Sequence, residues 1–183
     1  MLVFCECAYI ILHIKRDEVE ADMKAIMAPW RMSYIMGKKQ EGCVFCENSI
    51  RDECFVLLKG KTAFITMNRY PYTNGHLLVV PCRHIAQLED LLPEEGRELF
   101  NLVAVSVRVL KEAIKPEGFN IGINLGKAGG AGVDDHVHLH VVPRWVSDTN
   151  FMTSIAETRV IPEDVTKTCE MLKPYFKKNR LEV

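Results

Sequence analysis

The chain has 183 residues, of which 48% are hydrophobic and 26% are charged, and its formal net charge at pH 7 is −1. This size and composition predict one soluble globular domain, and a charge near zero gives no general attraction for nucleic acid. No apolar run approaches the roughly 18 residues of a membrane-spanning helix. We therefore expect neither a nucleic-acid nor a membrane partner.

The first 22 residues differ in composition from those that follow. Residues 1–14 are mostly apolar, but they lack the positive charge and the small-residue cleavage site of a signal peptide, and residues 15–22 are a charged run. We therefore expect an N-terminal extension, or a mis-assigned start, over residues 1–22. One domain is expected over residues 23–183.

Short stretches of β-branched, aromatic and other apolar residues predict strands in the middle of the chain. The first two expected strands form a hairpin through the turn Lys59-Gly60-Lys61. The expected strands cover residues 55–58, 63–67, 76–80 and 119–125, and another covers a histidine-rich stretch, 136–142.

Two helices are expected. An apolar stripe that begins after Pro93 predicts a long helix over residues 93–115. A second helix is expected over residues 162–178, interrupted or ended near Pro174, while residues 145–160 resemble a loop with weak strand character. The elements together predict an α+β fold: a mainly antiparallel sheet with one long helix and a C-terminal helix.

Three histidines alternate with apolar residues in the last expected strand. Successive side chains of a strand point to opposite faces, so His136, His138 and His140 line one face about 7 Å apart. A glycine-rich loop, residues 126–132, leads into this strand and supplies backbone N–H groups, a combination that favours phosphate chemistry. Two alternatives are buried histidines that only satisfy hydrogen bonds and one metal held by all three, for which a 7 Å spacing is poor.

Cys43 and Cys46 have the Cys-x-x-Cys spacing of a zinc half-site, and His84 and His136 are candidates for the other two ligands. The pair is also compatible with a redox motif or with two ordinary thiols in a turn. The chain has seven cysteines, an odd number without a regular disulfide spacing. This pattern indicates a reducing compartment, and we expect the cytoplasm.

The stretch from His136 to Arg144 resembles the signature of the histidine-triad nucleotide hydrolases and transferases. The cysteine pair, the Asn74-Gly75-His76 stretch, His84 and Asn124 match the family in the same order. Residues 28–31 and 145–152 resemble the diadenosine tetraphosphate phosphorylase, or ATP adenylyltransferase-like, branch. The resemblance covers about residues 29–165.

The chain departs from the common pattern of this family at three positions. Gly132 and Val133 stand where many members have a glutamine and a serine or threonine that contact phosphate. Asn68 stands at the position of an acidic ribose-binding residue. Backbone N–H groups are expected to replace the missing phosphate contacts, because glycine allows close approach.

The resemblance implies a five-stranded histidine-triad fold, a homodimer and an enzyme that cleaves dinucleoside polyphosphates at the α-phosphorus. His138 would attack the phosphorus and form a covalent nucleotidyl-histidine, while His76, His140 and Asn124 would complete the catalytic group. A structural zinc would be bound by Cys43, Cys46, His84 and His136. The expected nucleotide-binding residues are Asn68, Lys127, Gly130, Gly132, Val133 and Trp145, with the amides of residues 129–133 as oxyanion donors.

Several alternatives remain open at this level. The acceptor can be phosphate or water, with phosphate favoured by the resemblance. The protein can instead be a purine-nucleotide-binding regulatory module with little turnover, or a hydrolase of adenylylated small molecules. Trp30, Trp145 and Phe151 can stack on a purine or pack in the core.

Overall fold

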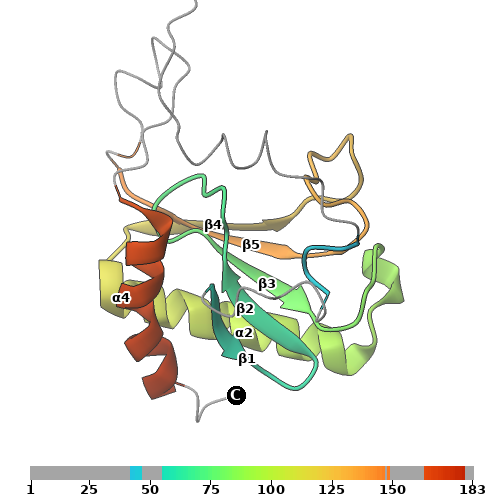
Figure 1. Cartoon of the computed structure of the whole chain (residues 1–183), viewed down its shortest axis with the longest axis horizontal. Coiled ribbons are helices and arrows are strands. Elements are labelled where there is room, and N and C mark those ends of the chain that lie inside the picture. The colour runs from blue at the N-terminus through green and yellow to red at the C-terminus, as the bar shows by residue number, and fades with distance from the viewer. Residues whose placement is uncertain (1–41, 47–54, 147, 149–162, 180–183) are drawn as a thin grey trace, which may run out of the picture. The chain divides into compact units, whose positions relative to one another are not determined.

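The computed structural model describes residues 42–46, 55–146, 148 and 163–179. Its single sheet has five strands, in the order β1-β2-β3-β5-β4, and every neighbouring pair is antiparallel. The strands are β1 (Val56–Lys59), β2 (Ala63–Met67), β3 (Leu77–Pro81), β4 (Gly118–Ile123) and β5 (Leu139–Arg144). The predicted five-stranded antiparallel sheet is confirmed (Figure 1).

The long helix α2 (Pro93–Ile114) follows a single 3-10 turn, η1 (Leu88–Asp90). Proline suits its first position, because the ring fixes φ and that N–H has no partner inside the helix. The carboxylate of Glu95 accepts a hydrogen bond from the N–H of Leu92 at 2.9 Å, which caps the same end. The helix ends at Lys115, which has a left-handed φ of 48°.

The C-terminal helix α4 (Val165–Lys178) runs through Pro174, so the expected interruption or end at this proline is wrong. Proline removes one backbone hydrogen bond from a helix. Leu172 and Phe176 on either side of it are fully buried, and this burial offsets the lost bond. In the described part of the chain, neither helix is long and apolar enough to cross a membrane.

The two faces of the sheet have different coverings. Leu139 and Val141 of β5 belong to one apolar core with residues of α2 and α4, and Figure 1 shows α2 crossing the sheet. Leu78 and Val80 of β3 belong to a separate small cluster on the other face. Because His140 lies between Leu139 and Val141 and pairs with Leu78, its side chain lies on the face away from the helices.

β5 begins at Leu139, three residues later than the histidine pattern predicts. β3 ends at Pro81, which has no N–H to continue a ladder. The N–H of Val137 donates instead to the carbonyl of Ile85 at 2.7 Å. Two of the three alternating histidines therefore lie in the approach to β5, and only His140 lies within it.

Candidate active site and metal centre

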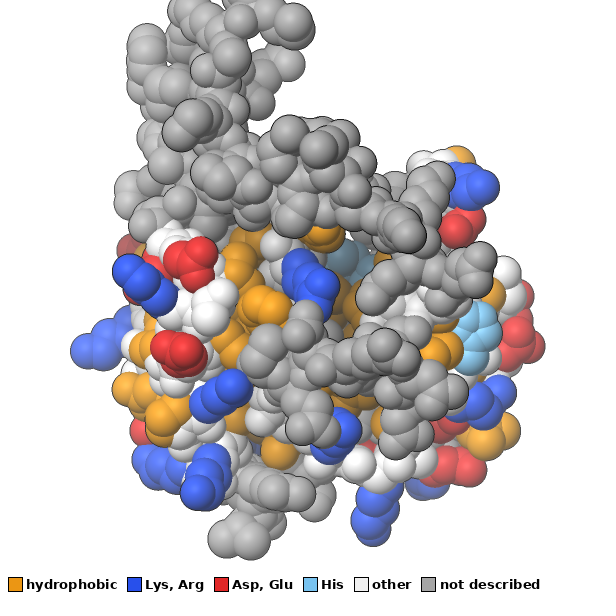
Figure 2. Space-filling model, viewed as in Figure 1, with side chains coloured by type: hydrophobic (Ala, Val, Ile, Leu, Met, Phe, Trp, Pro, Cys, Tyr) orange, Lys and Arg blue, Asp and Glu red, His pale blue; other side chains and the backbone are white. Residues whose placement is uncertain are grey.

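Five histidines lie close together beside the sheet, and we call them the histidine row. The ring centroids of His84 and His136 are 5.2 Å apart, those of His138 and His140 are 5.0 Å apart, and those of His140 and His76 are 5.1 Å apart. Histidine side chains reach the surface in two places on the face seen in Figure 2, both next to hydrophobic side chains. Two thiols lie at one end of the row, and a pair of hydrogen-bonded imidazoles lies at the other.

At one end, Cys43, Cys46, His84 and His136 bring four ligand atoms within 4.8 Å of one another. The Sγ of Cys43 is 3.1 Å from Nδ1 of His136, and the Sγ of Cys46 is 3.2 Å from Nδ1 of His84. A tetrahedral zinc site with ordinary bond lengths has sulfur–nitrogen edges of roughly 3.6 Å, so these two distances would lengthen slightly and the widest separations in the group would shorten. These four residues can hold a metal ion.

His138 and His140 lie outside this group, so the three alternating histidines do not converge on one metal. The cysteines of the group are free thiols. Burial raises the pKa of the Cys43 thiol to about 11, and a coordinated cation would deprotonate it.

Main-chain groups orient the ring of His136, which is fully buried. Its Nε2–H donates to the carbonyl of Pro81 at 2.9 Å, which leaves the lone pair of Nδ1 directed at the thiols. The segment that carries His84 is held to α2 by Arg83, whose guanidinium donates twice to Glu95, at 2.9 and 2.8 Å. Such a paired, planar contact fixes geometry as well as charge.

His138, beside the metal-binding group, is also buried. Its Nδ1–H donates to the carbonyl of His136 at 2.8 Å, so Nε2 carries the lone pair. Burial lowers the pKa of His138 and keeps the ring neutral. The ring of Phe45, between the two cysteines of the turn, lies 5.0 Å from that of His138 and 5.7 Å from that of His136.

At the other end of the row, His76 and His140 are hydrogen-bonded to each other. Nδ1 of His76 accepts from the N–H of Tyr72 at 3.1 Å and from Nδ2 of Asn68 at 3.2 Å. Its Nε2 is 3.0 Å from Nδ1 of His140. Nε2 of His140 is buried and has no hydrogen-bond partner among the described residues, and burial together with His138 lowers the pKa of His140 to about 4.

The turn before β3 places His76 in this pair. Gly75 has a φ of 75°, and a Cβ there would lie 2.7 Å from a methyl carbon of Ile114 in α2. Only glycine satisfies both conditions without strain. The ring of Tyr72 then stacks at 5.8 Å on His140.

The glycine-rich loop uses several of its own amides. The N–H groups of Gly129 and Ala131 donate to the carbonyl of Gly126, and the N–H of Gly130 donates to that of Lys127, at 3.0 to 3.2 Å. Those of Gly132 and Val133 make no hydrogen bond within the described residues. Of the five amides expected to face phosphate, these two remain available.

The other predicted nucleotide-binding side chains lie as follows. Nδ2 of Asn124 donates to the carbonyl of Gly130 at 3.4 Å, and the exposed Nζ of Lys127 lies 3.8 Å from Asp134. Trp145 is half-buried and its N–H donates to Asp148. Their contacts with a nucleotide stay predictions, and Trp30 and Phe151 lie outside the described residues.

Sequence reasoning missed two aromatic contacts and one basic residue. The contacts of Phe45 with His138 and of Tyr72 with His140 join segments that are distant in the sequence, so the local sequence does not indicate them. Arg144, the last residue of the histidine signature, is bonded to Asp148 and donates to Asn120 of β4 at 2.6 Å. It therefore links β4, β5 and the loop that follows.

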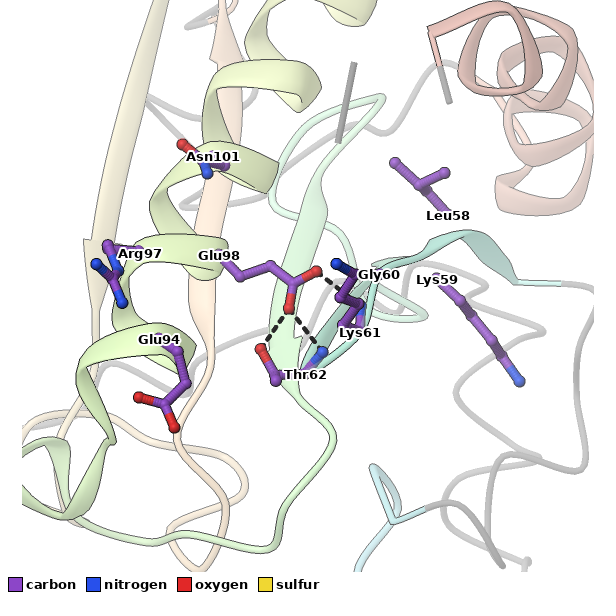
Figure 3. A pocket seen from close by; sticks show the side chains of 9 residues that line it. All are labelled: Leu58, Lys59, Gly60, Lys61, Thr62, Glu94, Arg97, Glu98 and Asn101. Carbon is purple, nitrogen blue, oxygen red and sulfur yellow. Dashed lines mark hydrogen bonds between the residues drawn. The ribbon is translucent and has the colours of Figure 1, made fainter. Parts of the chain in front are cut away.

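A hollow of about 510 Å³ lies between the β1–β2 turn and the start of α2, away from the histidine row. Figure 3 shows that Glu98 points into the turn, where its carboxylate accepts from the N–H groups of Lys61 and Thr62 at 2.7 and 2.6 Å. A Cβ on Gly60 would lie 2.2 Å from this carboxylate. Glu98 therefore makes a structural contact between the hairpin and the helix at this hollow. No histidine or cysteine lines the hollow.

Comparisons with known proteins agree with this geometry. Residues 50–146 match the model of the HIT domain family. The chain is 43% identical over 121 residues to an AP-4-A phosphorylase of Mycobacterium tuberculosis, covering 66% of this chain and 62% of that relative. It is 34% identical over 104 residues to the asymmetrical bis(5'-nucleosyl)-tetraphosphatase of Schizosaccharomyces pombe, covering 57% and 56%.

Among solved structures, the chain resembles a zinc-bound histidine triad family protein from Mycobacterium smegmatis. That protein is 29% identical, with a TM-score of 0.62, and the match covers 77% of this chain and 97% of the other. The chain spans less than two thirds of the length of the two curated relatives named above.

Proposed function

Because this chain belongs to the HIT domain family, we propose that it is a nucleotidyl transferase that cleaves dinucleoside polyphosphates. Diadenosine tetraphosphate is the expected type of substrate, cleaved at the α-phosphorus, with inorganic phosphate as the acceptor. The phosphorylase and tetraphosphatase among its relatives support this substrate class.

One observation carries the proposal: two neutral imidazoles lie side by side with complementary nitrogens. Nε2 of His138 has a lone pair, since Nδ1–H is bonded to the carbonyl of His136. Nε2 of His140, 5.0 Å away between ring centroids, is an unpartnered donor among the described residues. A phosphate between them would meet a nucleophile and a hydrogen-bond donor.

In the proposed reaction, His138 attacks the α-phosphorus and displaces the remaining polyphosphate, and phosphate then removes the nucleotide from His138. His140 would donate to a phosphate oxygen, and His76 would hold His140 in place. Asn124 and the N–H groups of Gly132 and Val133 are the expected donors to the non-bridging oxygens.

For the rest of the nucleotide we propose Asn68 toward the ribose, Lys127 toward the leaving phosphates and Trp145 toward a base. The loop position of Gly130 allows backbone to approach the phosphates. Nδ2 of Asn68 has two N–H donors, so one can bind the ribose while the other keeps its bond to His76.

We further propose that the cysteine–histidine group holds zinc, because two thiolates and two imidazoles are a ligand set that zinc prefers. Four protein ligands leave no open position, so zinc would supply folding free energy rather than a reacting water. The zinc-bound relative supports this assignment. Free thiols at these positions also favour a reducing compartment, and we propose the cytoplasm.

We also propose a homodimer. β4 is the last strand on its side of the sheet, and its residue Ile121 exposes 47% of its surface. An exposed apolar edge strand is a site for pairing with another sheet. Sedimentation analysis tests the dimer, and replacing Ile121 with lysine should favour the monomer.

Product analysis tests the activity. Diadenosine tetraphosphate incubated with the full chain should yield ADP and ATP only when inorganic phosphate is present. AMP and ATP in its absence would mean hydrolysis. Binding without any product from dinucleoside polyphosphates or other adenylylated compounds would favour the alternative, a purine-nucleotide-binding regulatory module. Products from adenylylated small molecules alone would favour a hydrolase of those compounds.

Rapid acid-free quenching tests the intermediate. A phosphorus–nitrogen bond is labile in acid and comparatively stable in alkali, so labelled substrate should leave label on a peptide that contains residues 137–144. The His138→Asn variant should remain unlabelled. Inversion of configuration at the α-phosphorus, with no label trapped, would instead indicate direct attack by phosphate or water.

A further inference from the structure

Neighbouring groups determine which ring nitrogens of His76 and His140 carry protons. We propose that this site transfers nucleotidyl groups without giving or accepting a proton, so that both the leaving group and the acceptor must be oxyanions. We also assign Asn68 as a positioning residue that maintains this state. The proposal rests on the proposed function and deepens it.

The side-chain amide of Asn68 is held in one orientation. Its Oδ1 accepts from the N–H of Tyr70 at 2.9 Å, which settles the orientation of the amide and directs Nδ2 toward His76. The N–H of Tyr72, which can only donate, points at the same nitrogen of His76. Nδ1 of His76 is therefore an acceptor, and in the neutral ring the proton is on Nε2.

The proton on Nε2 of His76 determines which nitrogen of His140 is protonated. Nε2–H of His76 donates to Nδ1 of His140 at 3.0 Å, so the proton of His140 is on Nε2. A second proton on Nδ1 of His140 would meet the N–H of His76. The arrangement therefore opposes an imidazolium at His140, and its lowered pKa agrees with a neutral ring.

In this protonation state, the ring of His140 can donate a hydrogen bond but cannot transfer a proton. His140 cannot act as a base, because its remaining lone pair already accepts from His76. It cannot act as an acid without becoming an anion, because His76 has no spare proton to pass on. Within the described residues, no carboxylate is hydrogen-bonded to His140. His140 therefore donates a hydrogen bond and keeps its proton.

The proposed chemistry balances without proton transfer. The lone pair of Nε2 of His138 forms the phosphorus–nitrogen bond, and the electron pair of the broken phosphorus–oxygen bond leaves on the polyphosphate oxygen. An oxygen of the phosphate dianion then forms a bond to phosphorus, and the phosphorus–nitrogen pair returns to Nε2. Water as acceptor would have to lose a proton, and an amine leaving group would have to gain one.

A substrate and acceptor series tests this inference on the full chain. We expect phosphorolysis of diadenosine tetraphosphate to exceed its hydrolysis, and to exceed cleavage of adenosine phosphoramidate, by about 100-fold or more, the usual contribution of acid–base catalysis. We also expect no solvent deuterium isotope effect on the phosphorolytic kcat. A normal isotope effect, or comparable rates with water or with the phosphoramidate, would overturn the inference.

The Asn68→Asp variant tests the positioning residue, with Asn68→Ala as the matched control. The carboxylate keeps an acceptor for Tyr70 and adds a charge that favours a proton on Nδ1 of His76. His76 could then pass its Nε2 proton to His140 as His140 releases its own. We expect phosphoramidate cleavage to rise about tenfold relative to phosphorolysis, with a new solvent isotope effect.

Asn68→Ala should lower both rates without changing their ratio. If the ratio of phosphoramidate cleavage to phosphorolysis is unchanged in Asn68→Asp, the assignment of Asn68 is overturned. If that variant does not fold, the wild-type substrate and acceptor series still tests the inference. A wild-type chain that cleaves no adenylylated substrate would refute the proposed function itself. Cleavage of diadenosine tetraphosphate with water and phosphate equally effective would refute the inference and the choice of phosphate as acceptor, but not cleavage of dinucleoside polyphosphates.

Discussion

His136 and His138 are two residues apart, and each donates one ring N–H to a main-chain carbonyl, but they use opposite nitrogens. His136 donates from Nε2 to Pro81 and directs Nδ1 at two thiols. His138 donates from Nδ1 to the carbonyl of His136, which leaves the lone pair on Nε2. The comparison teaches that the main chain selects which nitrogen carries the lone pair, and the neighbours of that lone pair decide its chemistry.

The largest effect should come from removing the lone pair of His138. We expect His138→Asn to lower turnover of diadenosine tetraphosphate by roughly a thousandfold or more, because a covalent nucleophile is lost. Metal content should not change, and nucleotide binding should stay within about tenfold. Steady-state kinetics and calorimetric titration measure both; retained activity above about 1% would contradict a nucleophilic role.

The group of expected metal ligands can be tested separately from His138. We expect Cys43→Ser or Cys46→Ser to lose bound zinc and to lower Tm by roughly 10 °C, because a structural zinc stabilises the fold directly. Cys82→Ser is the matched control, since Cys82 is exposed and outside the group of ligands. Metal analysis of protein purified without chelator should give one zinc per chain, and its absence would refute the assignment.

Phe45 links the expected metal ligands to the expected nucleophile, because its ring contacts both His136 and His138. We expect Phe45→Ala to lower kcat about tenfold with KM and zinc content unchanged, since a small displacement of a nucleophile is costly. Val44→Ala, at an exposed position of the same turn, should behave as wild type. Loss of zinc from Phe45→Ala would instead place the residue with the metal site alone.

Acid should destabilise the folded chain through protonation of His140. Its pKa is lowered to about 4 in the folded chain, against about 6.5 when unfolded. The unfolded state therefore binds more protons between these values, and stability falls as pH falls through this window. His140→Gln should remove on the order of 2 kcal/mol of this loss. Urea unfolding at pH 7 and pH 4.5 measures how far the free energy of unfolding falls in each protein. An equal fall in the wild-type chain and in the His140→Gln variant would contradict the prediction.

The smallest effect is expected from a region outside the comparison. A chain that starts at Met23 should fold and turn over substrate within about fivefold of the full chain, because residues 1–22 match no part of the family pattern. Residues 1–41 lie outside the described part of the structure, so this boundary remains a prediction. Circular dichroism and kinetics would contradict it if solubility or turnover fell further.

The sequence predicted the strands well because they depend on local signals. Short stretches of β-branched, aromatic and other apolar residues identified β2 with its observed bounds and β3, β4 and β1 within two residues at each end. The structure also brings together the four predicted ligands, Cys43, Cys46, His84 and His136, in a group that could hold a metal ion. Pro174 was misread because burial of its neighbours outweighs the helix-breaking tendency of proline.

The remaining features depend on where distant main-chain groups meet, and no residue type records that. The carbonyl of Pro81 and the N–H of Tyr72 orient two imidazoles, but every amino acid has a carbonyl and all except proline have an N–H. Glycines likewise predicted a permissive loop at 126–132 without showing that three of its amides are used internally. Roles of individual site residues therefore remain predictions.

Main-chain control of the imidazoles has an evolutionary consequence. Positions 72 and 81 can exchange one side chain for another and still supply the same N–H or carbonyl, provided that the backbone path is kept. Sequence drift at these positions therefore leaves the protons of the histidine row where they are. Position 72 has one forbidden replacement, because proline has no N–H; in this chain the proline stands one residue earlier, at Pro71.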